Sequence, residues 1–573
     1  MIVSMAAFTL AALAGLGADS APSAAPAYDL LLTNAEIYDG SGSPPTHGSV
    51  AVEGDTIVAV GPLPGAHGKR EIDLHGLAVS PGFVNVLSWA TESLLVDGRA
   101  ASDVAQGVTL EVFGEGWSMG PLSEAMKTEA LAHQGDLKYP ITWTTLGQYL
   151  DHLEAGGIAV NVASFVGATT VRIHEVGYAD RAPTPEELER MKALVGQAME
   201  DGALGLGSSL IYPPAFFAQT PELVALAQVA GQYGGVYISH MRSEGDRLLP
   251  AIDELLTIAR EARIPAEIYH FKAAGRANWP KFEEAIAKIE AARATGLKIT
   301  ANMYSYTAGA TGLSATLPPW AQEGGLEAFL GRLRDPAVRA RLAAEMDRPG
   351  ETWENFFLAA GPEQILLASF KQAALKPLTG KSLAEIARMR GVSPEQAVFD
   401  LILEDGNDPG AVYFLMSEDN VRRGLSLPWV SLGSDAEAPA PEGVFLQSSP
   451  HPRTYGNFAR FLGRYVREER LLPLAEAIRR LTSLPAENLH LGQRGRLAPG
   501  YFADLVVFDP ARIRDRATYE QPHQLAEGVL DVFVNGIQVL AEGKPTAARP
   551  GRAVRRASGP PSRVPTAAAP ARP

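Results

Sequence analysis

Four side chains that can bind a metal or transfer a proton stand at the ends of predicted strands. His240 and His270 end two strands that follow one another in the chain, and Glu115 and Asp435 end two others. Neighbouring parallel strands lie roughly 4.8 Å apart, so imidazoles at the ends of adjacent strands can reach one ion. Two histidines with two carboxylates are typical of a metal-assisted hydrolase, in which a bound ion lowers the pKa of water to roughly 7 and a carboxylate moves its proton.

Each of these residues, taken singly, also has a structural interpretation. A lone histidine at a strand end is usually hydrogen-bonded within the core, but two at the same register, together with Asp435, favour metal binding. Glu111 lies on the same strand face as Glu115, about 13 Å deeper at roughly 3.3 Å per residue. It is therefore too far away to share the ion and is expected to pair with Lys272 or another buried group. His174, which follows the third predicted strand, is a further candidate that faces the site.

A repeated alternation of strand and helix positions these residues. Thr184–Glu187 forms a capping box with proline at the first helical position, and apolar residues then recur at helical spacing as far as Met199. Units of about thirty residues with this alternation predict parallel β-α-β crossovers. Eight such strands are expected, at 82–87, 108–115, 159–166, 203–209, 236–240, 266–270, 298–304 and 428–435.

These eight strands predict an α/β protein built on a (β/α)8 TIM-like barrel, with its active site at the carboxyl ends of the strands. An open doubly wound sheet is the alternative, but no glycine-rich phosphate loop follows the first strand. Strand-like segments at both ends of the chain are expected to form a flanking β-sandwich. The expected divisions are a signal peptide (1–27), the sandwich (28–80 with 491–548), the barrel (81–490), a helical insertion between strands seven and eight (about 314–415) and a disordered tail (549–573).

Composition narrows the class of protein. The chain has 573 residues, a net charge of −15 and no cysteine. The acidic balance, without a local basic patch, argues against a nucleic-acid partner. The absence of cysteine excludes disulfides, thiol nucleophiles and cysteine-ligated zinc. A hydrophobic fraction of 46% is that of a folded chain.

The first residues of the chain bear on where the protein is found. They are apolar over a run too short to span a bilayer and are followed by small residues, as in a signal peptide. We therefore expect a periplasmic or secreted protein without a membrane span. The alternative is a cytoplasmic protein whose N-terminus is disordered or starts at the wrong codon. Nothing in the sequence sets the oligomeric state.

Several motifs, specific when taken together, resemble those of the amidohydrolase superfamily, and within it the N-acyl-D-amino-acid deacylase branch. The resemblance runs from Tyr28 to about Gly543. The matching stretches are Ser80–Phe83, Gln106–Thr109, Asp180–Glu186, Ser239–Glu244, Tyr304–Gly309, Met416–Asp419, Gly433–Asp435, His451–Gly456 and Ala503–Pro510. This family has a metal-bearing (β/α)8 barrel with a β-sandwich made from both chain ends.

The resemblance implies roles for individual residues. His240 and His270 match the two histidine ligands of a tightly held zinc ion. Asp435 matches the general acid and base that activates water and protonates the leaving amine. Arg453 matches the guanidinium that binds the substrate carboxylate, for which bidentate geometry is suited. Tyr306 is implied as a second substrate contact, and His174 is kept as a further substrate-binding candidate.

The sequence departs from the family pattern at two places. Leu87-Ser88-Trp89 stands where the family has a His-x-His pair after the first strand. The family's bridging cysteine on the second strand has no counterpart, and Glu115 is expected to replace it as an oxygen ligand. We therefore expect a single zinc ion, bound by Glu115, His240 and His270, and no second metal position.

The resulting functional hypothesis is zinc-dependent deacylation of a small molecule, an N-acyl-D-amino acid or a related small peptide. Two alternatives stay open. One is hydrolysis of a cyclic amide, a lactone or a dipeptide on the same scaffold. The other is a non-catalytic protein that binds a ligand at the mouth of the barrel.

Overall fold

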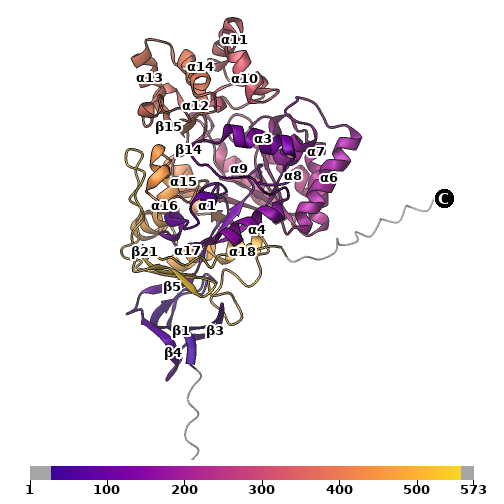
Figure 1. Ribbon diagram of the computed structural model, residues 1–573. Coiled ribbons are helices and arrows are strands. Elements are labelled where there is room, and N and C mark those ends of the chain that lie inside the picture. The colour runs from indigo at the N-terminus through magenta and orange to yellow at the C-terminus, as the bar shows by residue number, and fades with distance from the viewer. Residues whose placement is uncertain (1–26, 557–573) are drawn as a thin grey trace, which may run out of the picture.

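The computed structural model describes residues 27–556, which form three regions (Figure 1). A sheet made from both ends of the chain lies at the bottom of the view, an α/β domain lies in the middle, and an insertion lies at the top. The predicted signal peptide falls outside the described residues except for Ala27, and so do residues 557–573 of the predicted tail. Among the described residues, no helix has the length and apolar character needed to cross a membrane.

The terminal sheet has nine strands in the order β21-β20-β19-β18-β5-β1-β2-β3, with β4 paired to β1. Its junction is the antiparallel pairing of β18 with β5, in which Leu505 lies opposite Pro81. Leu32, Val79 and Phe533 are among the apolar side chains that share one buried cluster. The sheet therefore requires both chain ends. Its strands are Ala27–Ile37, Thr46–Glu53, Thr56–Gly61, His67–Asp73, Ala78–Pro81, Leu505–Phe508, Val529–Val534, Ile537–Ala541 and Lys544–Pro545 (β1–β5 and β18–β21).

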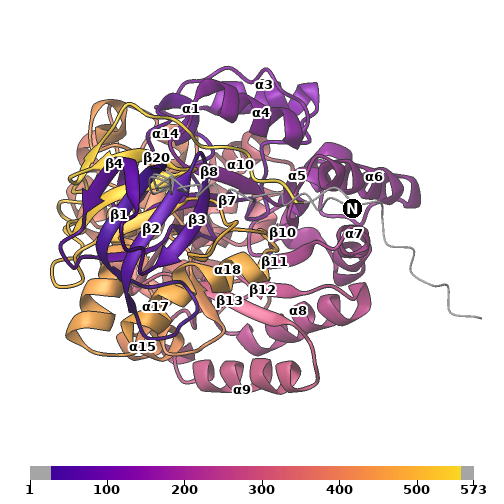
Figure 2. The ribbon, with the colours of Figure 1, turned by 90° about the horizontal axis from the view of Figure 1, so that it is seen from below.

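The strands of the α/β domain are parallel and lie in two sheets. One has the order β17-β13-β12-β11-β10-β9 and the other β6-β7-β8, so the single closed sheet expected from the sequence is not seen. The strands are Phe83–Asn85, Val108–Phe113, Asn161–Ser164, Val166–Gly167, Gly205–Ser209, Val236–His240, Ala266–Ile268, Ile299–Met303 and Val430–Leu432 (β6–β13 and β17). All of the predicted strand positions contain strand; β11 has the predicted bounds, and the strands at the other positions are shorter. Seen from below, β7, β8 and β10–β13 follow an arc with helices on its outer side (Figure 2).

Helices between the strands pack against the outside of this layer. The predicted capping box is present at α6, where Thr184 accepts from the backbone N–H of Glu187 and the Glu187 side chain accepts from that of Thr184. The helices of the domain are Ser93–Val96, Ala101–Val104, Glu124–His133, Leu146–Gly156, Ala168–Glu175, Pro185–Glu200, Thr220–Gln232, Leu248–Ala262 and Lys281–Ala294 (α1–α9). Those after the insertion are Glu418–Leu425, Arg453–Arg460, Leu474–Leu481 and Ser483–Asn488 (α15–α18).

The insertion is not purely helical. It contains a three-stranded antiparallel sheet of β14 (Ala308–Gly312), β16 (Gly410–Phe414) and β15 (Ile365–Ser369), in that order. Its own apolar cluster includes Leu313, Leu367 and Tyr413. Its helices are Leu326–Leu333, Pro336–Met346, Phe356–Ala360, Leu383–Arg390 and Pro394–Asp405 (α10–α14).

The prediction of a disordered tail from residue 549 is wrong for residues 549–556. Gly551 and Val554 donate backbone hydrogen bonds to Ile158 and Val162, and Arg555 pairs with Asp151 at 2.6 Å. A composition rich in proline, alanine and arginine cannot build a core of its own. Here the segment is held by the backbone of the neighbouring β8 region instead.

Candidate metal centre

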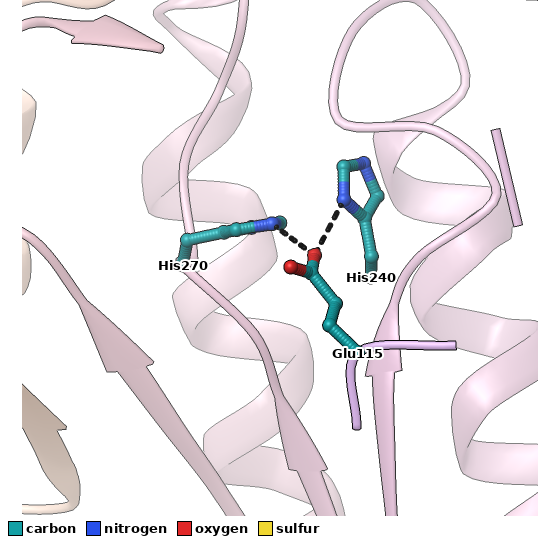
Figure 3. Close-up of side chains that lie close together, drawn as sticks. All are labelled: Glu115, His240 and His270. Atoms are coloured by element: carbon teal, nitrogen blue, oxygen red, sulfur yellow. Dashed lines mark hydrogen bonds and ion pairs between the residues drawn. The ribbon is translucent and has the colours of Figure 1, made fainter. Parts of the chain in front are cut away.

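Three ligand atoms converge at the carboxyl ends of the parallel strands. The Oε1 atom of Glu115 lies 3.0 Å from Nδ1 of His240 and 2.8 Å from Nε2 of His270. The two imidazole rings stand nearly perpendicular, with centroids 4.4 Å apart. All three side chains are buried, and their ligand atoms lie within 4.8 Å of one another. Figure 3 shows both rings directing a nitrogen at the same carboxylate oxygen.

Local backbone conformation places each ligand. His240 is the last residue of β11, whereas His270 follows β12 with a φ of 34° and donates its backbone N–H to Asn302 Oδ1 at 3.0 Å. Glu115 stands between Gly114 and Gly116, which have φ values of 106° and 72°. A Cβ atom at Gly116 would lie 2.7 Å from the backbone nitrogen of Ser209, so only glycine lets this loop approach β10.

One carboxylate lies behind both imidazoles. Glu244 Oε1 is 2.9 Å from Nδ1 of His270, and Glu244 Oε2 is 3.6 Å from Nε2 of His240. Lys272 donates to Glu244 Oε1 at 2.6 Å. A carboxylate that accepts a hydrogen bond from the ring nitrogen not bound to the metal fixes the tautomer and orientation of a metal-binding histidine. Sequence reasoning assigned no role to Glu244, although it lies in one of the motif stretches.

The charges of this cluster favour a cation. Burial alone would raise the pKa of Glu115, but the charge of His270 and hydrogen bonds from both imidazoles hold that pKa below its ordinary value. Burial and Lys272 would lower the pKa of His270, yet Glu244 and Glu115 outweigh them and raise it to about 9. Two carboxylates thus stabilise positive charge between the rings.

Asp435 and Trp89 complete the cluster. Asp435 follows β17, has a φ of 51° and donates its backbone N–H to the carbonyl oxygen of Leu87 at 2.8 Å. Burial, the largest influence, raises the pKa of Asp435. The indole Nε1 of Trp89 donates to Glu115 Oε2 at 2.9 Å and to Asp435 Oδ1 at 3.1 Å. This bridge was not predicted, because its partners are far apart in the chain.

Arg453 lies beside Asp435. Its Nη2 is 2.8 Å from Asp435 Oδ2, and its guanidinium carbon is 4.5 Å from the centroid of the Tyr304 ring. Within residues 27–556, its buried Nε and Nη1 have no hydrogen-bond acceptor. A buried guanidinium with unmatched N–H groups calls for an acceptor from outside the chain.

Two predicted substrate contacts lie elsewhere. Tyr306 donates to Asp515 Oδ2 at 3.2 Å and is not among the residues that line the cavity, whereas Tyr304 lines it. Strand β13 ends at Met303, so the alternation that would put residues 304 and 306 on one face stops there. His174 lies in the last turn of α5 and contacts Glu175 at 2.9 Å; at 1.5 Å per helical residue it is about 10 Å beyond the strand end. The geometry supports a substrate role for neither Tyr306 nor His174.

A cavity of about 540 Å³ opens above these residues. Its floor contains Glu115, His240, His270, Asp435 and Arg453. Its roof comes from the insertion, including Thr311, Gln322, Phe356, Asp408 and Tyr413. The size is that of a small-molecule site.

Comparison with known proteins gives consistent matches. The sequence model of the amidohydrolase family matches residues 70–540. A D-aminoacylase from Alcaligenes xylosoxydans xylosoxydans is 34% identical over 533 residues, covering 92% of this chain and 98% of the relative. A D-aminoacylase structure described as having a binuclear metal centre, with one-metal activation and second-metal attenuation, has a TM-score of 0.78 and 32% identity, covering 92% of this chain and 100% of the other. The structure of an N-acyl-D-glutamate deacylase from Bordetella bronchiseptica, complexed with zinc and a phosphonate inhibitor, has a TM-score of 0.77 and 30% identity over the same shares of the two chains.

Proposed function

The chain belongs to the amidohydrolase family, and from this premise we propose that it hydrolyses the linear amide of N-acyl-D-amino acids, releasing a carboxylate and a free amino acid. The observation that carries the proposal is the meeting of a three-atom metal site, a buried aspartate and an arginine with unmatched N–H groups at one cavity. The preference for the D configuration rests on the relatives, which are named as D-aminoacylase and N-acyl-D-amino-acid deacylases.

The residues present fit one zinc ion. Imidazole nitrogen and carboxylate oxygen are accepted zinc ligands, and three protein ligands leave a fourth position for water or substrate. Glu115, His240 and His270 would supply those three atoms, and Glu244 would hold the rings in place. When bound, zinc polarises a carbonyl group and lowers the pKa of water.

Asp435 is the proton carrier in this proposal. Its raised pKa suits a group that takes a proton from the attacking water and returns it to the leaving nitrogen. The Trp89 N–H and Arg453 Nη2 each bind a different oxygen of Asp435 and so fix the plane of its carboxylate. Proton transfer therefore requires little rearrangement of the site.

Arg453 and its neighbours would hold the amino-acid end of the substrate. The free N–H groups of Arg453 can donate to a substrate carboxylate while Nη2 keeps its bond to Asp435. Lys272, whose Nζ lies 5.6 Å from the centroid of the Tyr304 ring, adds a second positive charge to the same wall. Tyr304 thus takes the place that the sequence suggested for Tyr306.

We propose a single metal ion because Trp89 occupies the position of the missing His-x-His pair. Its indole N–H already bonds to Glu115 Oε2 and Asp435 Oδ1, the two oxygens that would otherwise face a second cation. An N–H donor stabilises both carboxylates without adding a ligand.

We also propose that the two parallel sheets complete an eight-stranded barrel beside a β-sandwich. Supporting this, Leu87 and Leu432 accept backbone hydrogen bonds from Asp435 and Val86, between the segments of β17 and β6. On the other side, Leu204, before β10, donates to Ser164 at the end of β8.

The test is elemental analysis of the purified protein together with a rate screen of N-acetyl-D- and N-acetyl-L-amino acids. We expect about one zinc ion per chain and release of free amino acid from the D series. His270→Ala should lose both metal and activity. Hydrolysis of the L series alone would refute the D assignment, and an inactive, metal-free protein would refute the hydrolase.

A further inference from the structure

A second cavity lies directly beside the catalytic one. It has a volume of about 550 Å³, within the range of small-molecule sites. Its lining comes from the segments that follow β6 and β7 and from α3 and α5, and most of its side chains are apolar or aromatic, including Trp117, Met119, Leu122, Met126 and Ile173. The site described above uses none of this volume.

The wall between the two cavities is thin and consists largely of indole rings. Trp89, Trp117 and Glu437 line both cavities. Trp89 is held by its bonds to Glu115 and Asp435. Trp117 is 38% exposed, and within the described part of the chain no hydrogen bond anchors its side chain. A substrate's acyl chain that extends away from the metal-binding side chains can therefore pass beside Trp117.

The position of the second cavity suits the acyl half of the proposed substrate. The groups assigned to the amino-acid carboxylate, Arg453, Lys272 and Tyr304, follow β17, β12 and β13. The second cavity lies among the segments that follow β6 and β7, which belong to the other parallel sheet. A secondary amide is planar and trans, so its acyl group and its amino-acid carbon point in opposite directions. An acyl group directed from the metal-binding side chains toward Trp117 would enter the second cavity, because Trp117 lines both cavities.

The carboxyl groups of this cavity do not favour an anionic occupant. Glu92 bonds to the hydroxyl of Tyr139, and Glu129 bonds to that of Tyr178. Glu437, the remaining carboxyl group of the lining, is buried, and burial together with the charge of Glu92 raises its pKa to about 7. A carboxylate-tipped chain would be repelled here, whereas a hydrocarbon chain gains from leaving water.

We propose that the second cavity binds the acyl chain of the substrate, so that the enzyme prefers amino acids carrying a medium or long uncharged hydrocarbon acyl group. This inference rests on the proposed deacylase function and specifies its substrate class. The acyl chain lies between Trp117, Met126 and Ile173, while the scissile amide lies over Glu115, His240 and His270.

The first test compares chain lengths in the wild-type protein loaded with zinc. One D-amino acid is supplied with acetyl, butanoyl, octanoyl and succinyl groups, and kcat/KM is measured for each. We expect octanoyl to exceed acetyl by about tenfold or more, since single methylene groups in apolar pockets already discriminate about tenfold. Succinyl, of similar length to butanoyl but charged, should be the poorest of the four.

A pair of variants on α3 tests the location. Ala130 lines the second cavity, whereas Ala132 is exposed on the same helix. Ala130→Phe should lower kcat/KM for the octanoyl substrate about tenfold and leave the acetyl substrate within twofold, and Ala132→Phe should change neither.

Three outcomes would overturn the assignment: equal rates for acetyl and octanoyl substrates in wild type, equal losses on both in Ala130→Phe, or faster cleavage of a dipeptide with a free amine. If no N-acyl-D-amino acid is cleaved at all, the deacylase function itself fails. That result is distinct from cleavage of the acetyl substrate without any chain-length preference.

Discussion

Strand β7 carries two buried carboxylates whose surroundings are opposite in kind. Glu115, just beyond the strand, faces two imidazoles and an indole N–H at the floor of a cavity. Glu111, four residues earlier, shares the Nδ2 group of Asn85 with Asp103. The neighbouring histidines hold down the pKa of Glu115. At the second site, burial and the charge of Glu111 raise the pKa of Asp103 far above its ordinary value.

The difference shows that burial alone does not mark a functional carboxylate. Asp103 and Glu111 both accept hydrogen bonds from Nδ2 of Asn85, which also bonds to Ser434, so Asn85 ties α2 to β7. Glu115 stays charged because its neighbours can be positive, and that charge is available to a cation. Substitutions can separate the metal-facing groups at the strand ends (the upper layer) from Asp103, Glu111 and Asn85 deeper in the domain (the lower layer).

The largest effect on metal content and activity is expected from removing the negative charge of Glu115, in the upper layer. Glu115→Gln should lose bound zinc and reduce kcat/KM by more than about 100-fold, because loss of a ligand exceeds the 10–100-fold cost of losing its support. Glu111→Gln is the matched control on the same strand and should keep its metal. Elemental analysis and steady-state kinetics measure both. Equal metal loss in the two variants would contradict the division.

The next effect concerns the carboxylate behind the histidines. Glu244→Gln keeps the shape but removes the charge that lies 2.9 Å from Nδ1 of His270. Zinc affinity should fall about 10–100-fold, as measured by competition with a chelator. Unchanged affinity would mean that Lys272, not the ring nitrogens, is the partner of Glu244 that matters.

A smaller effect is expected at the substrate-binding arginine. Arg453→Lys retains positive charge but loses the fork of N–H groups. KM for an N-acyl-D-amino acid should rise about tenfold, the equivalent of one hydrogen bond to a charged group. Metal content should not change, since Arg453 contacts Asp435 and none of the three ligands. An unchanged KM would remove Arg453 from the carboxylate site.

The smallest effect concerns Asp103, in the lower layer, and is a change in the free energy of unfolding. The folded-state pKa of Asp103 is raised, so its contribution to stability is full below pH 3.8 and is lost as pH rises through the folded-state pKa. Asp103→Asn should therefore flatten the fall in unfolding free energy that begins as pH rises above 3.8, as measured by urea denaturation from acidic to alkaline pH. A slope identical to that of wild type would show that Asp103 is not the proton-holding group.

The sequence predicted the arrangement where local pattern decides it. His240, His270, Glu115 and Asp435 were placed together because each stands where a strand ends, and strand ends in a parallel layer meet at one edge. The Thr184 capping box was likewise a local signal. The eight strand positions follow from the same kind of pattern. The sequence predicted a β-sandwich from the two chain ends, and the structure joins them in one nine-stranded sheet.

What the sequence did not predict depends on contacts between distant segments. The bridge from Trp89 to Asp435 and the support of His270 by Glu244 join residues on separate strands. Tyr306 was implied by the family resemblance, whereas the structure places Tyr304, just beyond the end of β13, at the cavity. Lys272 pairs with Glu244, not with Glu111, because it lies in the upper layer.

The sheet built from both chain ends has a consequence for synthesis on the ribosome. Strands β1–β5 emerge first, but β5 gains its neighbour β18 only after the whole catalytic portion has been translated. Until then β5 presents an unpaired edge, a known starting point for association between nascent chains. Synthesis of β18 is therefore the step that allows this edge to be covered.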